Sequence, residues 1–516
     1  MTGRRRAAFI GAFAVVFLLA FPQRFGAVEF DLGFGAAWLA PALLILGLRG
    51  LAPRAAARWA FFAGLAAHAL VFHWIYVATV HYGDAPVLVG VLAPIGLALY
   101  PALFFALFGA AWSGFGAAGL ASPFVAAALW VALEWARSFV LTGFPWALIG
   151  YAQHQNASLL GLAPWTGVWG LSFATVLGSA ALAALASGER SRRAPIAALL
   201  GVAALHGFGT LDGVLDDTAP TGSVRVATLQ GNIDQGVKWS PAWAERTLAD
   251  YEALTRKAAE QGAQLVLWPE TAAPGSPDWS DELALRLGAL ALETNATLVV
   301  GAVGAERIAQ GGVRYYDSAF VVAPDGRIVD RYDKTHLVPF GEYVPLRDLL
   351  GRFVSAIARG AATTDVSPGR TPRAIAIPLP GGATLTAGVP ICYELLFPNL
   401  VSRFVSDGGQ VLLAITNDAW YGRTGAPYQF LVMTAVRAAE NRVWTARAAN
   451  TGVSALIDDR GRVRMQTKLF EQTLLVADLP LRTGASFYAR HGDWLPLAAS
   501  VGVAALAVAG RVRRRN

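Results

Sequence analysis

The sequence contains a single cysteine, Cys392, and is also poor in charge. One cysteine cannot form an intrachain disulfide, and it cannot build a zinc site that needs several thiolates. Charged residues make up 15% of the chain, against roughly 25% in a typical soluble protein. The chain is too apolar for a disordered protein, and its glycines lack the three-residue period of collagen. We therefore expect an ordered chain that is not an ordinary soluble protein.

Long apolar runs account for the low charge. A helix needs about 20 apolar residues to cross a bilayer, and candidate runs lie near residues 7–22, 32–48, 59–80, 86–110, 117–137, 165–187, 195–211 and 493–510. The expected organisation is a membrane domain over residues 1–211 with seven transmembrane helices, a soluble domain over 222–488 and a C-terminal transmembrane helix over 493–510.

The net charge of +7 comes from arginines at the margins of these runs. The clusters precede the first run and follow the second, sixth and eighth: Arg4, Arg5, Arg6, Arg49, Arg54, Arg58, Arg190, Arg192, Arg193, Arg511, Arg513, Arg514 and Arg515. Basic residues are retained on the cytoplasmic side, so this alternation predicts cytoplasmic termini and a soluble domain on the periplasmic or outer side of a bacterial inner membrane. Elsewhere acidic residues outnumber basic ones, and we expect no nucleic-acid partner.

The first seven apolar runs contain few ionisable residues, among them His68, His73, Glu134 and Arg137. A transporter usually needs such groups at mid-membrane. Glu134 and Arg137 are three residues apart, so they can pair on one helical face or line a cavity, and the sequence leaves both interpretations open. The scarcity favours a membrane anchor with a lipid-facing site over a transport pathway.

The soluble domain alternates strand and helix patterns. Strands are expected at 223–233, 263–268, 297–303, 384–391 and 411–416, and helices at 240–261, 280–294, 394–406 and 427–442. Asp325-Gly326 and Gly381-Gly382 are typical of hairpin turns. This order predicts an α/β domain with mixed sheets and helices outside them.

Three residues of this domain are candidates for chemistry. Cys392 lies between a strand and a helix, where a helix N-terminus favours the thiolate, although a buried free cysteine is the alternative. Lys334 is one of only four lysines among 42 cationic residues, which indicates a need for a compact ammonium rather than one more surface cation. Glu270 directly follows an apolar strand, and Glu342 and Glu394 are further acidic candidates near the lysine and the cysteine.

Other active-site motifs are absent. The sequence has no Gly-x-Ser-x-Gly elbow, no P-loop and no His-Glu-x-x-His motif. His336 is the only histidine in the body of the soluble domain, and a Cys–His pair with Cys392 stays open. No cluster of acidic residues and histidines indicates a metal site, and we expect neither a metal nor a cofactor.

Several strings of the sequence match a known family. Glu270 after Trp-Pro, Lys334 in Tyr-Asp-Lys-x-His and Cys392 in Cys-Tyr-Glu resemble the triad of the nitrilase superfamily. The strings YDKTHLVPFGEYVP (332–345), ICYELLFP (391–398), TNDAWYG (416–422) and EWARSFVLTGFPWALIGYAQ (134–153) make the chain resemble the membrane-embedded apolipoprotein N-acyltransferase family of that superfamily. The resemblance implies an α-helical membrane domain of several spans that carries an αββα sandwich.

The resemblance also implies an activity and its partners. The acyl donor would be a phospholipid, and the acceptor would be the N-terminal amine of a diacylglyceryl-cysteine apolipoprotein, in the last step of lipoprotein maturation. Glu270 would act as the base, Cys392 as the nucleophile that carries a thioester, and Lys334 as the oxyanion donor, in a ping-pong order. Trp239, Glu342, Tyr393 and Glu394 would surround the cleft.

Alternatives to this activity remain open at this point. One is a membrane-tethered nitrilase-like amidase that uses water as the second nucleophile. Another is a transporter or receptor whose soluble domain only binds a ligand. Phe144, Trp146 and Tyr151 would serve as interfacial aromatic anchors, with or without substrate contact, and we expect a monomer in the bilayer.

Overall fold

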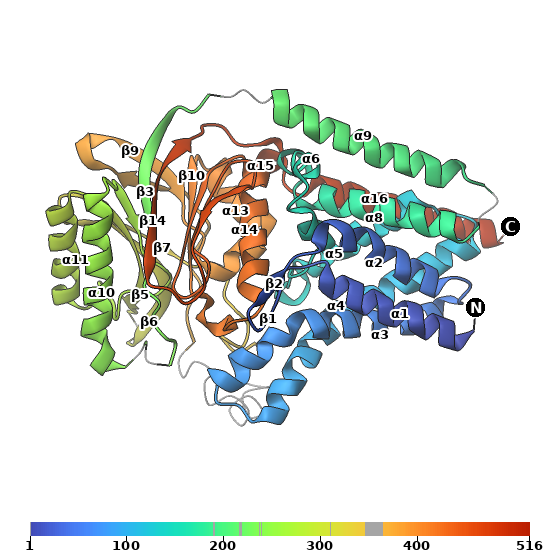
Figure 1. Cartoon of the computed structure of the whole chain (residues 1–516), viewed down its shortest axis with the longest axis horizontal. Coiled ribbons are helices and arrows are strands. Elements are labelled where there is room, and N and C mark those ends of the chain that lie inside the picture. Colours follow the sequence, from blue (N-terminus) through green and yellow to red (C-terminus); the bar gives the residue numbers. More distant parts are fainter. Residues whose placement is uncertain are drawn as a thin grey trace.

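The computed structural model of the chain describes residues 2–188, 191–215, 219–236, 238, 240–309, 311–345 and 365–515. Two halves lie side by side along the long axis of the molecule (Figure 1). One, the helical half, is built of helices, and the other is built of sheets flanked by helices. Both described ends of the chain belong to the helical half.

Helices occupy all eight segments that the apolar runs predict. They are α1 (Gly3–Leu19), α2 (Gly33–Leu48), α3 (Pro53–Val71), α4 (Val87–Ala117), α5 (Pro123–Arg137), α8 (Val168–Ala186), α9 (Arg193–Leu215) and α16 (Trp494–Arg515). Among the described residues, five helices are long and apolar enough to cross a membrane: Pro53–Trp74, Val87–Ala117, Val168–Ala186, Arg193–Val214 and Trp494–Val512. The remaining helices α1, α2 and α5 have 17, 16 and 15 residues, so the count of eight crossings stays a prediction.

Short elements complete the helical half. These are η1 (Phe72–Trp74), the π-helical η2 (Val77–His81), η3 (Val140–Thr142), η4 (Ile149–Gln153), α6 (Ala157–Leu160), α7 (Ala163–Thr166) and a hairpin of β1 (Gln23–Phe25) and β2 (Val28–Phe30). The expected run over 59–80 is therefore not one helix, because α3 ends at Val71 and two short helical turns follow it.

The other half contains two six-stranded sheets within the described residues. One has the order β14-β3-β4-β5-β6-β7, with β14 (Thr473–Leu481), β3 (Gly222–Gln230), β4 (Leu265–Leu267), β5 (Thr297–Arg307), β6 (Val313–Val322) and β7 (Ile328–Asp333). The other has the order β13-β12-β11-β10-β9-β8, with β13 (Val463–Gln466), β12 (Ala455–Ile457), β11 (Thr445–Ala449), β10 (Val411–Thr416), β9 (Thr384–Gly388) and β8 (Ile375–Pro378). Both sheets mix parallel and antiparallel pairs.

Two helices cover each sheet, which confirms the αββα sandwich (Figure 1). Helices α10 (Pro241–Glu260) and α11 (Asp281–Thr294) pack on the first sheet through a buried apolar cluster. Helices α13 (Pro398–Ser406) and α14 (Ala426–Asn441) pack on the second and separate it from the membrane helices. Short turns η5 (Pro380–Gly382), η6 (Cys392–Leu396) and η7 (Asp418–Tyr421) and helix α15 (Phe487–His491) complete this half.

Most of the turns and helix caps form at the residues that predict them. Asp325-Gly326 joins the antiparallel strands β6 and β7, and Gly381-Gly382 joins β8 and β9, with positive φ at each of these glycines. Ser280 accepts a hydrogen bond from the Leu283 N–H and so caps α11, whereas the Ser240 side chain makes no capping hydrogen bond at the start of α10.

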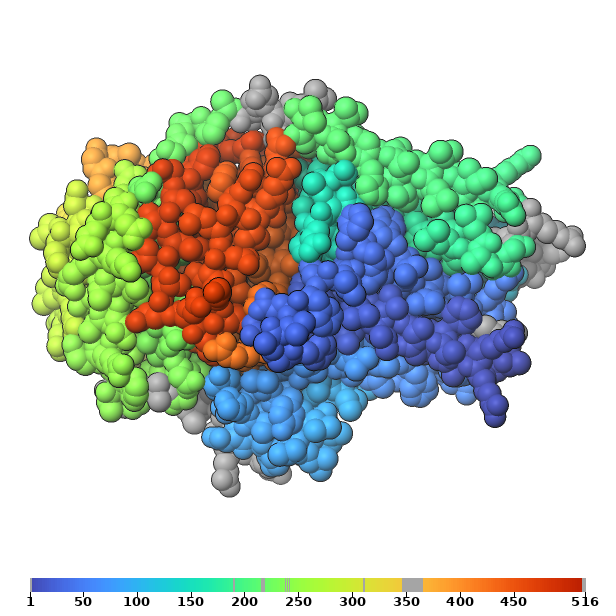
Figure 2. All heavy atoms as spheres, in the orientation of Figure 1, coloured from blue at the N-terminus to red at the C-terminus, as the bar shows by residue number. Residues whose placement is uncertain are grey.

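The helical half and the sandwich are joined by specific contacts rather than by a linker alone. The Trp146 indole N–H donates to the Gln429 side chain of α14 at 2.8 Å, and the Arg24 guanidinium donates to the Tyr428 hydroxyl at 3.1 Å. Figure 2 shows the dark blue residues of the β1–β2 hairpin against the orange and red atoms of the sandwich. Phe144, Trp146 and Tyr151 are buried in this junction, so the prediction that they anchor at the lipid interface is wrong.

Candidate active site

The predicted triad comes together at one end of the sandwich because each residue follows a strand. Glu270 comes shortly after β4 and Lys334 directly after β7, both in the first sheet. Cys392 comes four residues after β9 in the second sheet, and its neighbour Ile391 still forms a parallel bridge with Ile415. The carboxyl ends of these strands therefore meet where the two sheets face each other.

The backbone of Cys392 is left-handed, with a φ of 46°. Such a conformation costs a non-glycine residue about 1–2 kcal/mol, so neighbouring contacts must hold it. Glu394 supplies those contacts: it accepts hydrogen bonds from the Ile391 and Thr335 N–H groups and from the Thr335 and Tyr332 hydroxyls, all within 2.8 Å. Glu394 is fully buried and joins the cysteine turn to the lysine loop, so it positions both.

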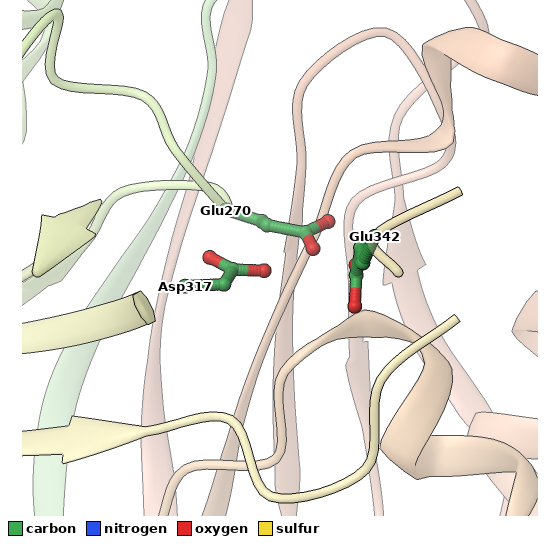
Figure 3. A group of neighbouring side chains, drawn as sticks. All are labelled: Glu270, Asp317 and Glu342. Carbon is green, nitrogen blue, oxygen red and sulfur yellow. The ribbon is translucent and has the colours of Figure 1, made fainter. Parts of the chain in front are cut away.

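The ammonium of Lys334 is fully buried among three carboxyl groups. Its Nζ lies 3.0 Å from an oxygen of Glu270, 3.2 Å from one of Asp317 and 2.5 Å from one of Glu342. Figure 3 shows these three side chains pointing toward one another from separate segments of the chain. Their oxygens lie within 4.8 Å of one another, as metal ligands do, but the Lys334 ammonium lies among them and supplies the positive charge that they need.

These charges set the protonation states of the site. Burial acts to raise the pKa of Glu270, but the Lys334 ammonium and hydrogen bonds from its neighbours outweigh burial and lower that pKa to about 2. Burial, and then the negative charge of Glu270, raises the pKa of the Cys392 thiol well above its usual value. This direction favours a neutral thiol at rest over the thiolate that a helix N-terminus favours, because Cys392 is buried and η6 is a short helical turn.

Tyr393 points away from the charged cluster and ties the cysteine turn to the helical half. Its hydroxyl donates to the Gly143 carbonyl at 3.2 Å, and its ring stacks near Phe144 and His336. The His336 ring also lies against Phe397, with centroids 3.9 Å apart. This aromatic packing makes His336 a poor candidate for the base in a Cys–His pair. Among charged groups, Glu270 and Lys334 have the largest effects on the pKa of the Cys392 thiol.

Sequence reasoning missed three polar residues of the site. Asn417 follows β10 and donates its backbone N–H to Glu270 at 2.7 Å. Lys238 is buried, and its ammonium donates to the Glu270 carbonyl at 3.1 Å and to the Thr271 hydroxyl at 2.5 Å. Asp317, in β6, contacts Lys334. Lys238 is also one of only four lysines, a signal that the sequence offered. Trp239, predicted beside the cleft, lies outside the described residues.

Glu134 and Arg137 hold the segment that carries Gly143 and Trp146. The Glu134 carboxylate accepts the Ile149 N–H at 2.8 Å. The Arg137 guanidinium contacts the His68 ring nitrogen at 3.2 Å and donates to the Ala147 carbonyl at 3.4 Å. Among the described contacts Glu134 and Arg137 do not form an ion pair with each other, so the predicted pairing is wrong. Both residues line a pocket with aromatic walls between α1, α4 and α5, as the cavity-lining interpretation predicts.

Two family models match separate parts of the chain. Residues 225–488 match the family model for carbon-nitrogen hydrolases, which defines the sandwich as a nitrilase-like domain. Residues 13–181 match the model for the N-terminal domain of apolipoprotein N-acyltransferases. A mutant of the Nesterenkonia AN1 amidase from the nitrilase superfamily aligns with 54% of this chain and 95% of its own, at 23% identity and a TM-score of 0.37.

Two curated relatives are similar over most of the chain. The apolipoprotein N-acyltransferase of Geobacter metallireducens is 41% identical over 91% of this chain and 90% of its own length. That of Pseudomonas aeruginosa is 37% identical over 92% of this chain and 91% of its own length. The chain belongs to the apolipoprotein N-acyltransferase family.

Proposed function

We propose that this protein transfers a fatty acyl chain from a phospholipid to the N-terminal amine of a diacylglyceryl-cysteine apolipoprotein. The observation that carries the proposal is the lone cysteine, which is near the Glu270–Lys334 pair and lies on a turn that contacts the helical half through Tyr393. Family membership supports the same activity. The proposal requires that this thiol be reached by substrates that are anchored in the outer surface of the bilayer.

The first half-reaction would acylate Cys392. As Sγ attacks the ester carbonyl carbon of the phospholipid, Glu270 takes the thiol proton, so a neutral thiol and an ionised carboxylate are the required resting states. Lys334 then donates to the oxyanion of the tetrahedral intermediate. The carbon–oxygen bond breaks, Glu270 returns the proton to the departing lysophospholipid alkoxide, and the acyl chain stays on sulfur as a thioester.

The position of Lys334 suits that order of events. Its three hydrogen-bonded partners at rest are all carboxyl groups. Protonation of Glu270 removes the negative charge that holds one of these N–H groups, which becomes available for the oxyanion just as that charge forms. One such donor contributes about 3–4 kcal/mol to the transition state in comparable sites.

The second half-reaction would transfer the acyl chain to nitrogen. Glu270 takes a proton from the incoming α-amine as its nitrogen attacks the thioester carbonyl. The carbon–sulfur bond breaks, and the same proton passes to the departing sulfur, which restores the thiol. Because both lipids need the same thiol, the order is ping-pong.

The test is intact mass of the purified protein after incubation with a defined phospholipid and no amine. We expect one acyl mass on Cys392, followed by its loss and acylation of the peptide when a diacylglyceryl-cysteine peptide is added. Cys392→Ala and Cys392→Ser should both fail to transfer while they retain the wild-type unfolding midpoint, because serine is a much poorer nucleophile beside the same base.

Two results would contradict this proposal and favour another function. Rapid release of the acyl group to water in the absence of amine would indicate the alternative, a membrane-tethered nitrilase-like amidase, which the carbon-nitrogen hydrolase match also accommodates. Full function of Cys392→Ala would indicate a ligand-binding role for the domain and exclude an acyl-enzyme.

We also infer an orientation from the arginine clusters that flank the apolar helices. Both termini would lie in the cytoplasm and the sandwich on the periplasmic side of the inner membrane, with the protein acting as a monomer. Protease added to intact spheroplasts should cleave within the sandwich and leave a C-terminal epitope tag uncut. The reverse pattern would overturn the orientation.

A further inference from the structure

Asp317 is placed in the charged cluster by the β6–β7 hairpin. Ser318 lies opposite Asp333 in the register of the two strands, so the next residue after β7, Lys334, reaches Asp317. The Lys334 backbone N–H donates to the Asp317 carbonyl at 2.8 Å, and its ammonium lies 3.2 Å from the Asp317 carboxyl group. The Asp317 side chain is buried, so the hairpin fixes both ends of this contact without help from solvent.

The other two carboxyl groups of the cluster have donors on both oxygens. Glu270 accepts from the Lys334 ammonium at one oxygen and from the Asn417 N–H, at 2.7 Å, at the other. Glu342 accepts from the same ammonium and, at its second oxygen, from the Val338 N–H at 2.9 Å. Two donors stabilise the charged form of each of these carboxylates.

Asp317 differs from them in its supply of donors. Its Oδ2 lies near the Lys334 ammonium, but its buried Oδ1 receives no hydrogen bond from any described donor. Burying an ionised carboxylate oxygen without a hydrogen-bond donor destabilises the folded protein, whereas a protonated carboxyl group can itself donate a hydrogen bond. A carboxyl oxygen of Glu270 lies within 4.8 Å of one of Asp317, and two neighbouring carboxyl groups can share a hydrogen bond only when one of them carries a proton.

The charges around Asp317 lead to the same assignment. The ionisable groups that face it are Glu270 after β4, Lys334 after β7, Glu342 in the following turn, and Lys238. On the neighbouring strand β5 the residue opposite Asp317 is the uncharged Val303. Two ammonium groups thus face three carboxyl groups, and one proton on a carboxyl group makes the buried cluster neutral.

We propose that Asp317 is a neutral carboxylic acid in the resting protein and a positioning residue that donates its proton in a hydrogen bond to Glu270. This inference rests on the proposed function, in which Glu270 must be ionised and aimed at the thiol. A neutral Asp317 also leaves the charge of Lys334 available to Glu270, Glu342 and the oxyanion. Burial, and then the charge of Glu270, raises the pKa of Asp317 well above its usual value, which agrees with this assignment.

The consequence is a defined response to pH. When Asp317 loses its proton at alkaline pH, a second negative charge forms beside Glu270 and competes for Lys334. The hydrogen bond to Glu270 is lost at the same time, so acylation of Cys392 should fall. Lys238 also titrates in this range, because burial lowers its pKa to about 8, and the variants must separate the two groups.

The experiment compares Asp317→Asn, Asp317→Ala and, as the matched control, Asp325→Asn in the exposed turn of the same hairpin. Full-length protein in nanodiscs is incubated with phospholipid, and the rate of thioester formation on Cys392 is followed by intact mass across pH. Asparagine mimics a protonated aspartic acid, so Asp317→Asn should acylate within about threefold of wild type and lose the alkaline decline. Asp317→Ala should be slower by about 10- to 100-fold, as expected for a lost hydrogen bond to a charged group.

A second measurement does not depend on activity. The infrared difference spectrum of wild type minus Asp317→Asn at neutral pH should contain the carbonyl band of a protonated carboxylic acid, and that of wild type minus Asp325→Asn should not. A carboxylate band instead, or a folded Asp317→Asn that is as slow as Asp317→Ala or keeps the alkaline decline, overturns the proposal. If wild type itself forms no thioester, the proposed function fails, while the infrared band still decides the protonation of Asp317.

Discussion

The two helical layers of the sandwich face different surroundings. In α11 only five of 14 residues are buried, and Leu285 and Leu292 are 73% and 64% exposed. In α14 every residue except Tyr428 is buried, including Arg437 and Glu440. The first layer has one face toward its sheet and one toward solvent, whereas the second has a sheet on one side and the membrane helices on the other.

The difference shows in what the polar residues of α14 contact. Glu440 accepts the Val168 N–H at the start of α8 and pairs with Arg437, which in turn donates to the Tyr151 hydroxyl. Tyr151 lies in η4 of the helical half. The polar face of α14 therefore docks on the helical half. The turn that carries Cys392 contacts the same junction, because the Leu396 carbonyl lies 3.5 Å from the Tyr151 hydroxyl.

Glu440→Ala should have the largest effect on stability, because it removes a charge from the buried face of α14. The substitution leaves the Arg437 charge buried without its carboxylate, a loss that destabilises proteins by about 3–5 kcal/mol. We expect a large fall in the thermal unfolding midpoint of the detergent-solubilised protein, together with loss of thioester formation. An unchanged midpoint would show that the interface does not need this pair.

Tyr151→Phe should have an intermediate effect. It removes a hydroxyl that accepts from Arg437 at 3.2 Å, and a hydrogen bond to a charged group contributes about 1.5–3 kcal/mol. Because the same hydroxyl contacts the cysteine turn, we expect a lower acylation rate as well as a lower unfolding midpoint. If only the midpoint falls, Tyr151 stabilises the junction without positioning Cys392.

Leu285→Ala should have the smallest effect on stability, because Leu285 lies on the solvent-facing side of α11 rather than on the buried helix α14. Leu285 is exposed on α11, and such substitutions usually change stability by no more than about 0.5 kcal/mol. The matched variant Leu287→Ala, 1% exposed on the same helix, should cost about 2–5 kcal/mol because it opens a cavity. Thioester formation by Leu285→Ala should match wild type, and a clear loss would mean that the outer face also serves the reaction.

Much of the architecture is predictable because its signals are local. Strand alternation, the glycine turns at Asp325-Gly326 and Gly381-Gly382, and the strand-end positions of Glu270 and Cys392 all follow from a few neighbouring residues. These local patterns predict an α/β domain with mixed sheets and helices outside them. The αββα arrangement, which the structure has, is implied by the resemblance to the family, and the catalytic roles of Glu270, Lys334 and Cys392 stay a prediction.

The remainder depends on contacts between distant residues. Asp317 is one polar residue in a strand pattern, and only the pairing of β6 with β7 brings it to Lys334. The β1–β2 hairpin forms between the first two apolar runs, where the sequence shows no strong strand pattern. The protonation state of Cys392 depends on the burial of the complete site, which no local pattern reports.

The docked layer has a consequence for attempts to simplify the protein. If the sandwich were excised as a water-soluble fragment, α14 would present its whole outer side to solvent, with an arginine and a glutamate stripped of their α8 and η4 partners. Such a fragment would tend to aggregate through that face. In this fold the helical half covers α14 as a solvent layer cannot. A soluble version of the sandwich would therefore need a redesigned outer face of α14.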